Sequence, residues 1–228
     1  MTGVDLTRVQ AVLFDMDGTL AETDEEYLRQ LIRLARPLRF FFGRAGEARV
    51  LRRWMMASEG MASFLLTIPD RLGIDEPLAA LTDRLAWSRG LGRPGAFRVV
   101  QGVPEMLTRL AQQLPLAVVS SRDRRGTLAF LDQWNLRPHF STVITALSAR
   151  RMKPHPAPVY AAAKALGVAP ERCLMVGDTR ADILAGRRAG AQTAGVLCGF
   201  GEREELAACG ANAILASTAE VGKLLSAV

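Results

Sequence analysis

Short apolar runs recur along the chain and are bounded by polar or glycine residues. Runs this short and this apolar are typical of strands that are buried on both faces. The runs cover residues 9–14, 116–119, 142–145, 173–176, 193–197 and 213–215. Apolar residues at helical spacing between these runs predict helices over 103–114, 123–134, 158–166 and 181–189. Strands that alternate with helices in this way indicate a parallel, doubly wound α/β sheet.

Residues 23–95 have a different pattern. Apolar positions there recur at helical spacing, as at Tyr27, Leu28 and Leu31, without a convincing strand run. The glycine- and proline-bearing segment 90–95 suggests the point of return to the sheet. We therefore expect an α/β core of residues 1–22 and 96–228, with a helical cap domain of residues 23–95 inserted after the first strand.

Length and composition are those of a globular protein. The 228 residues suffice for one α/β domain with a large insertion. No apolar run approaches the ~20 residues of a membrane helix, and residues 1–10 do not resemble a signal peptide. The three cysteines, Cys173, Cys198 and Cys209, form no CxxC pair. These features predict a cytoplasmic protein with no membrane partner, no disulfide and no zinc site.

The chain is basic, with a net charge of +6 and a pI near 9.9. A basic protein can bind nucleic acid, which is one alternative function. The 26 Arg and 3 Lys are nevertheless scattered, and we find neither a helix-turn-helix cue nor a basic tail. We therefore expect no nucleic-acid partner. The positive charge is compatible with small anionic substrates.

The segment 15–20, Asp-Met-Asp-Gly-Thr-Leu, directly follows the first predicted strand. Two carboxylates so close together at the end of an apolar strand are unfavourable unless a cation is nearby. Mg²⁺ binds carboxylate and carbonyl oxygens and would relieve the repulsion. An Asp-Gly pair alone more often forms a hairpin turn. The full segment after a strand favours a metal site.

Three further motifs follow the segment 15–20 along the chain. Ser120 ends the run Leu-Ala-Val-Val-Ser-Ser, Lys153 opens Lys-Pro-His-Pro, and residues 177–182 read Gly-Asp-Thr-Arg-Ala-Asp. These four motifs, in this order, make the chain resemble the haloacid dehalogenase-like superfamily, in its phosphatase branch with a small helical cap. The resemblance is close over residues 9–20 and about 100–200. It implies a Rossmann-like core.

The resemblance also implies different catalytic roles for the aspartates. Asp15 is expected to be the nucleophile that carries the phosphoryl group, and Asp17 the general acid/base. We expect the Asp15 carboxylate to be ionised at pH 7 without an activating base. Asp178 completes a Mg²⁺ site with the Asp15 carboxylate and the main-chain carbonyl of Asp17.

Other residues are expected to bind the phosphoryl group or support the site. By the same resemblance, Ser120, its neighbour Ser121 and Lys153 bind the phosphate. Thr19 has a supporting role. Asp182 follows Asp178 by about one helical turn, and two interpretations remain open. It supports Lys153 or the metal, or it is simply a favourable acid in the first turn of a helix.

The expected substrate is a small phosphorylated metabolite, and the closest subgroup resemblance is to phosphoglycolate phosphatase-like enzymes. Residues 29–98 hold 13 Arg against 6 Asp and Glu, which suits a substrate with a second anionic group. A sugar-phosphate mutase of the beta-phosphoglucomutase type and a pyrophosphatase remain alternatives. Dehalogenases lack the second aspartate of the motif, and a catalytically silent regulator is disfavoured because no motif residue is missing. We expect a monomer or a homodimer.

Overall fold

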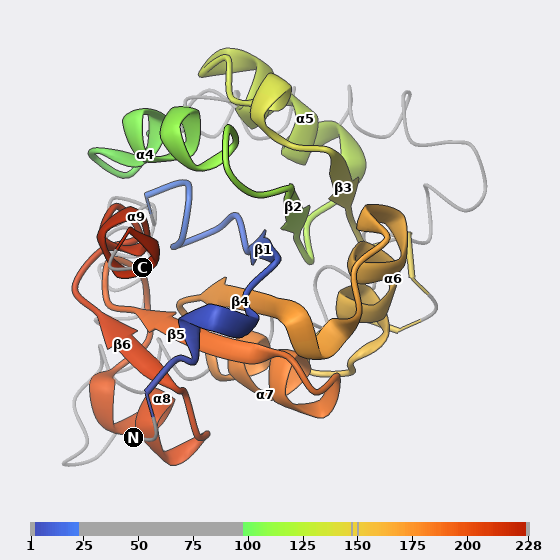
Figure 1. Ribbon diagram of the computed structural model, residues 1–228. Helices are drawn as coiled ribbons and strands as arrows, with labels where there is room; N and C mark the ends of the chain where they lie inside the picture. The colour runs from blue at the N-terminus through green and yellow to red at the C-terminus, as the bar shows by residue number, and fades with distance from the viewer. Residues whose placement is uncertain (1–2, 23–97, 147, 150, 227–228) are drawn as a thin grey trace, which may run out of the picture.

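A single parallel sheet organises the protein. The computed structural model describes residues 3–22, 98–146, 148–149 and 151–226. Six parallel strands lie in the order β3-β2-β1-β4-β5-β6 (Figure 1). Their bounds are Ala11–Phe14 (β1), Leu116–Val119 (β2), Thr142–Ile144 (β3), Cys173–Gly177 (β4), Gln192–Val196 (β5) and Ala213–Leu215 (β6). The predicted parallel α/β sheet is confirmed.

Helices follow the strands along the chain. They are α4 (Val103–Leu110), α5 (Arg124–Gln133), α6 (Ala157–Leu166), α7 (Arg180–Arg188), α8 (Arg203–Ala208) and α9 (Glu220–Leu225). Short 3-10 helices span Leu6–Arg8 (η1), Arg137–His139 (η4) and Pro170–Arg172 (η5). The four predicted helices are present, but α4 ends four residues early, and residues 111–114 continue as hydrogen-bonded turns before Pro115. The short helices α8 and α9 were not predicted.

Successive strand residues point to opposite faces of the sheet, and helices cover both faces. In β1, Val12 and Phe14 join a core shared with α4, α5 and α9. Ala11 and Leu13 face the other way, into a core shared with α6 and α7. Burial on both faces explains why the strands are apolar runs rather than alternating patterns.

The strand order reverses direction between β1 and β4. From β1 the chain builds outward through β2 and β3, and then returns to place β4, β5 and β6 on the other side. In open α/β sheets, ligands bind at the carboxyl ends of the strands beside such a switch point. The topology therefore points to the residues that directly follow β1 and β4.

The two described ends that flank residues 23–97 lie side by side. The Glu22 N–H donates to the Arg98 carbonyl (2.8 Å), and the Val100 N–H donates to the Leu20 carbonyl (2.9 Å). The chain thus leaves and rejoins the core next to β1. The predicted cap, 23–95, lies outside the described residues. No helix of the described part is long and apolar enough to cross a membrane.

Candidate active site

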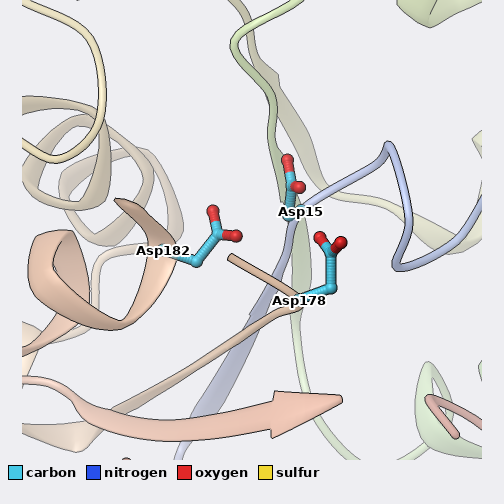
Figure 2. Close-up of side chains that lie close together, drawn as sticks. All are labelled: Asp15, Asp178 and Asp182. Atoms are coloured by element: carbon cyan, nitrogen blue, oxygen red, sulfur yellow. The ribbon is translucent and has the colours of Figure 1, made fainter. Parts of the chain in front are cut away.

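Three buried carboxylates meet at the switch point. Asp15 follows β1 and Asp178 follows β4, and parallel pairing of Phe14 with Val176 brings the two strand ends together. Asp182 joins them from the first turn of α7. One oxygen from each carboxylate lies within 4.8 Å of the others. Figure 2 shows the three side chains converging from these separate segments.

Lys153 links two of these carboxylates. Its Nζ donates to Asp15 Oδ1 (2.6 Å), to Asp182 Oδ1 (2.6 Å) and to the Val119 carbonyl (2.9 Å). The side chain is only 4% exposed. Burial by itself would lower the pKa of Lys153, but the two carboxylates outweigh it and raise the pKa. The structure thus places a permanent positive charge against Asp15.

The ionisation of Asp15 depends on its neighbours. Burial, and then the neighbouring carboxylates of Asp182 and Asp17, raise the pKa of Asp15 to about 8, although Lys153 opposes the rise. Without a further cation this rise favours the protonated form at pH 7, so the expected ionised carboxylate depends on a cation such as the expected Mg²⁺ beside it. The short sequence motif that contains Asp15 does not reveal how many other carboxylates the fold brings close to it.

Asp178 is held by residues from two segments, the loops that follow β1 and β5. Its Oδ2 accepts from the Phe200 N–H (2.7 Å), and its Oδ1 lies 3.4 Å from the Thr19 hydroxyl. A Cβ at Gly18, whose φ is +75°, or at Gly199 would overlap the Asp178 carboxylate. The loop after β5 that contains Phe200 was not predicted from the sequence. Its signal was the Gly-Phe-Gly sequence at 199–201.

Asp182 combines the two interpretations considered for it, a bond to Lys153 and a place in the first turn of a helix. Oδ1 accepts from Lys153, while Oδ2 accepts from the Thr179 backbone N–H (3.0 Å) and hydroxyl (2.6 Å). It therefore supports Lys153 and also caps α7. A Cβ at Gly177 would overlap the Asp182 side chain, so the glycine of this motif makes room for the acid that follows it.

Asp17 turns away from the carboxylate cluster toward Arg122, which sequence analysis did not single out. Arg122 Nη2 donates to Asp17 Oδ1 (2.6 Å) and Nε donates to Oδ2 (3.1 Å). The Arg122 backbone N–H also donates to Ser120 Oγ (3.0 Å), and Ser120 is buried. Ser121 is half-buried. The missed signal was an arginine two residues after the predicted phosphate-binding serine.

The buried cluster suits a divalent cation. In the part of the chain that the structure describes, Asp15, Asp178 and Asp182 bring three carboxylates into one buried site, and Lys153 supplies one ammonium against them. Such an excess of buried negative charge is costly without a metal ion. Asp182 accepts three short hydrogen bonds, one from Lys153 and two from Thr179, whereas the Thr19 hydroxyl lies 3.4 Å from Asp178 Oδ1. We therefore favour Asp15 and Asp178 as the carboxylate ligands.

Known proteins resemble this chain over most of its length. A family model described as haloacid dehalogenase-like hydrolase matches residues 9–190. The chain is 28% identical over 232 residues to a phosphoglycolate phosphatase of Chromobacterium violaceum, covering 97% of this chain and 99% of that protein. It is 41% identical over 85 residues to the pyrophosphatase PpaX of Oceanobacillus iheyensis, which is 37% of this chain and 40% of that protein.

The fold has matching solved structures. A putative beta-phosphoglucomutase from Thermotoga maritima superposes with a TM-score of 0.68 at 24% identity, over 96% of this chain and 100% of that one. That similarity concerns the fold alone. The family match spans most of the chain and includes every residue of the buried cluster. The chain therefore belongs to the haloacid dehalogenase-like hydrolases, and it is a phosphatase of their phosphoglycolate phosphatase-like branch.

Proposed function

We propose that this phosphatase hydrolyses a small acidic phosphate monoester, with Mg²⁺ as its cofactor, through an aspartyl-phosphate on Asp15. The observation that carries the proposal is the contact between Lys153 Nζ and Asp15 Oδ1 inside the buried carboxylate cluster. A nucleophilic carboxylate with an ammonium against it, at the end of a central strand, is what transfer of an anionic phosphoryl group requires.

In the first step, an Asp15 carboxylate oxygen attacks phosphorus and the ester P–O bond breaks. Asp17 gives a proton to the departing alkoxide. Lys153 lies where it neutralises charge on the phosphoryl oxygens, and the Ser120 hydroxyl donates a hydrogen bond to one of them. The Arg122 N–H occupies an acceptor position of Ser120 Oγ, so the hydroxyl keeps its own proton for that bond.

In the second step, water attacks the phosphorus of the aspartyl-phosphate. Asp17 takes the proton of this water, inorganic phosphate leaves, and the Asp15 carboxylate is restored. Asp182 holds Lys153 in place throughout, because its other oxygen is anchored on Thr179 at the start of α7. When bound by Asp15, Asp178 and the Asp17 main-chain carbonyl, Mg²⁺ supplies positive charge that favours ionised Asp15 and the anionic phosphoryl group.

Phosphate release with Mg²⁺ from a panel of phosphorylated compounds tests the proposal. The panel should include phosphoglycolate, beta-glucose 1-phosphate and pyrophosphate, so that phosphatase, mutase and pyrophosphatase activities are separated. We expect phosphoglycolate to be hydrolysed with the highest kcat/KM. Turnover of pyrophosphate alone, or isomerisation of the sugar phosphate without release, would replace this proposal with the corresponding alternative.

Asp178→Asn is expected to weaken Mg²⁺ binding and to lower kcat/KM by about 10²-fold or more, because a ligand carboxylate is lost. Its fold should persist, since an amide oxygen still accepts from the Phe200 N–H. Titration of activity with Mg²⁺ measures the change. Asp132→Asn, which alters an exposed acid paired with Arg137, is the matched control. Full activity of Asp178→Asn in excess chelator would contradict the assignment.

The stability of the chain should depend on pH when chelator removes divalent cations. Asp15 ionises near pH 3.8 in the unfolded chain but near 8 in the fold. Between these values the folded chain binds more protons, so the free energy of unfolding falls as pH rises. Mg²⁺ favours ionised Asp15, so saturating Mg²⁺ should flatten this dependence. Thermal unfolding from pH 5 to pH 8 measures both effects, and parallel curves with and without Mg²⁺ would refute them.

A further inference from the structure

We infer that Arg122 determines substrate specificity by binding a second anionic group, a carboxylate, on the leaving part of the ester. In the structure described here, the guanidinium holds Asp17 instead. The substrate's carboxylate would replace Asp17 on the guanidinium and release the Asp17 carboxylate toward the leaving oxygen. This inference rests on the proposed function and names the feature that the site selects in its substrate.

The exposed side of the site is formed by the pair of Arg122 and Asp17. The two side chains are 37% and 34% exposed, whereas those of Lys153 and Asp182 are almost fully buried. The phosphoryl group is expected at the buried end, against Lys153 and Asp15. The rest of the substrate therefore extends toward the exposed end, where the guanidinium lies.

Arg122 is held in this position by its surroundings. Its backbone N–H donates to Ser120 Oγ (3.0 Å), which ties it to the phosphate-binding segment. Its side chain crosses the first turn of α5, where a Cβ on Gly126 would come within 2.9 Å of Arg122 Cδ. Asp123 caps this turn through the Gly126 N–H (2.8 Å). The absence of a side chain at Gly126 thus makes room for the arginine stem.

The bond pattern of the pair fits carboxylate recognition. Nε and Nη2 of Arg122 each donate to a different oxygen of Asp17, which is the two-point geometry that a guanidinium offers to any carboxylate. A substrate carboxylate can take the place of the Asp17 carboxylate with the same two bonds. An ester without an acidic group cannot replace the Asp17 carboxylate, so Asp17 stays bound to the Arg122 guanidinium.

The position of Arg122 relative to the proposed reacting atoms also suits the binding of a substrate carboxylate. Asp17 is the group proposed to protonate the leaving oxygen, and Arg122 is bonded directly to Asp17. In phosphoglycolate, a single carbon separates the carboxylate from the leaving oxygen. The Arg122 guanidinium contacts the acid/base Asp17 directly, and the substrate carboxylate is one carbon from the leaving oxygen. The guanidinium is therefore close enough to bind that carboxylate while Asp17 protonates the leaving oxygen.

The test compares phosphoglycolate with ethyl phosphate, which lacks the carboxylate but has the same length of carbon chain. For the full chain with Mg²⁺, we expect kcat/KM to favour phosphoglycolate. Arg122→Met should lower the ratio of the two kcat/KM values by about 10- to 100-fold, since two charge-assisted hydrogen bonds to the carboxylate are lost. Arg122→Lys should restore the ratio only in part, because an ammonium is a point charge.

Two further variants separate specificity from structure. Gly126→Ala leaves Arg122 present but crowds its stem, and should lower the same ratio by about 3- to 10-fold. Arg125→Met removes an exposed charge from the same helical turn and should leave the ratio as it was. A ratio for Arg122→Met within about twofold of the unaltered chain would overturn the inference. Failure of the unaltered chain to hydrolyse either ester would overturn the proposed function, and this inference with it.

Discussion

Asp15→Asn should abolish turnover, with a loss on the order of 10⁶-fold, because an amide is a poor nucleophile toward phosphorus. The fold should persist. Lys153 keeps its bonds to Asp182 and to the Val119 carbonyl, so the ammonium is not left without acceptors. The measurement is a trapping experiment with a labelled aryl phosphate, quenched in acid to preserve an acyl phosphate. No label should be bound to Asp15→Asn.

Asp17→Asn is the matched comparison for this experiment. It changes the same residue type in the same motif but leaves the nucleophile and the Asp17 main-chain carbonyl in place. An aryl leaving group needs little protonation, so this variant should take up label and then stall, with turnover lowered by about 10²–10⁴-fold. Label on Asp15→Asn, or normal turnover by Asp17→Asn, would contradict the assignment of nucleophile and acid/base.

Lys153→Met should lower both stability and activity. The change leaves Asp15 and Asp182 buried without the cation that lies between them. Breaking a buried ion pair from one side typically costs about 3–5 kcal/mol of unfolding free energy. Turnover should fall by about 10²-fold or more, because a charge that stabilises the transferred phosphoryl group is gone. Denaturant unfolding and kinetics on the same preparation measure the two effects.

Lys164→Met provides the control, since this lysine is exposed on α6 and the change removes the same charge. It should alter stability by less than about 0.5 kcal/mol. In Lys153→Met, the missing ammonium should raise the pKa of Asp15 further, so its loss of stability should grow as pH rises. A Lys153→Met chain as stable and active as Lys164→Met would refute the role of the buried ammonium.

The sequence was sufficient to predict most of the fold. Strands buried on both faces must be apolar throughout, and that requirement is visible without a structure. Helices α8 and α9 escaped notice because each has only six residues, which is too short to display an apolar stripe over two turns. The end of α4 at Leu110 was not predicted because apolar residues continue at helical spacing as far as Leu114. Residues 111–114 form hydrogen-bonded turns rather than α-helix.

The residues around the site were predicted less completely than the strands that carry them. The position of Asp15 and Asp17 directly after an apolar run predicted a metal site there. Ser120, Lys153, Asp178 and Asp182 followed from the resemblance to a family. Arg122 and Phe200 were missed, since one arginine after a serine and one Gly-Phe-Gly sequence are weak signals when each is taken alone.

What the sequence determined by itself is the kind of chemistry and the order of strands and helices, because motif residues and hydrophobic periodicity are local. Only the tertiary structure decided which charges face one another. It placed Lys153 between Asp15 and Asp182, and it paired Asp17 with Arg122 across 105 positions of the chain. The ionisation of a buried carboxylate depends on such neighbours and on the exclusion of water. The raised pKa of Asp15 is therefore a property of the folded site rather than of its motif.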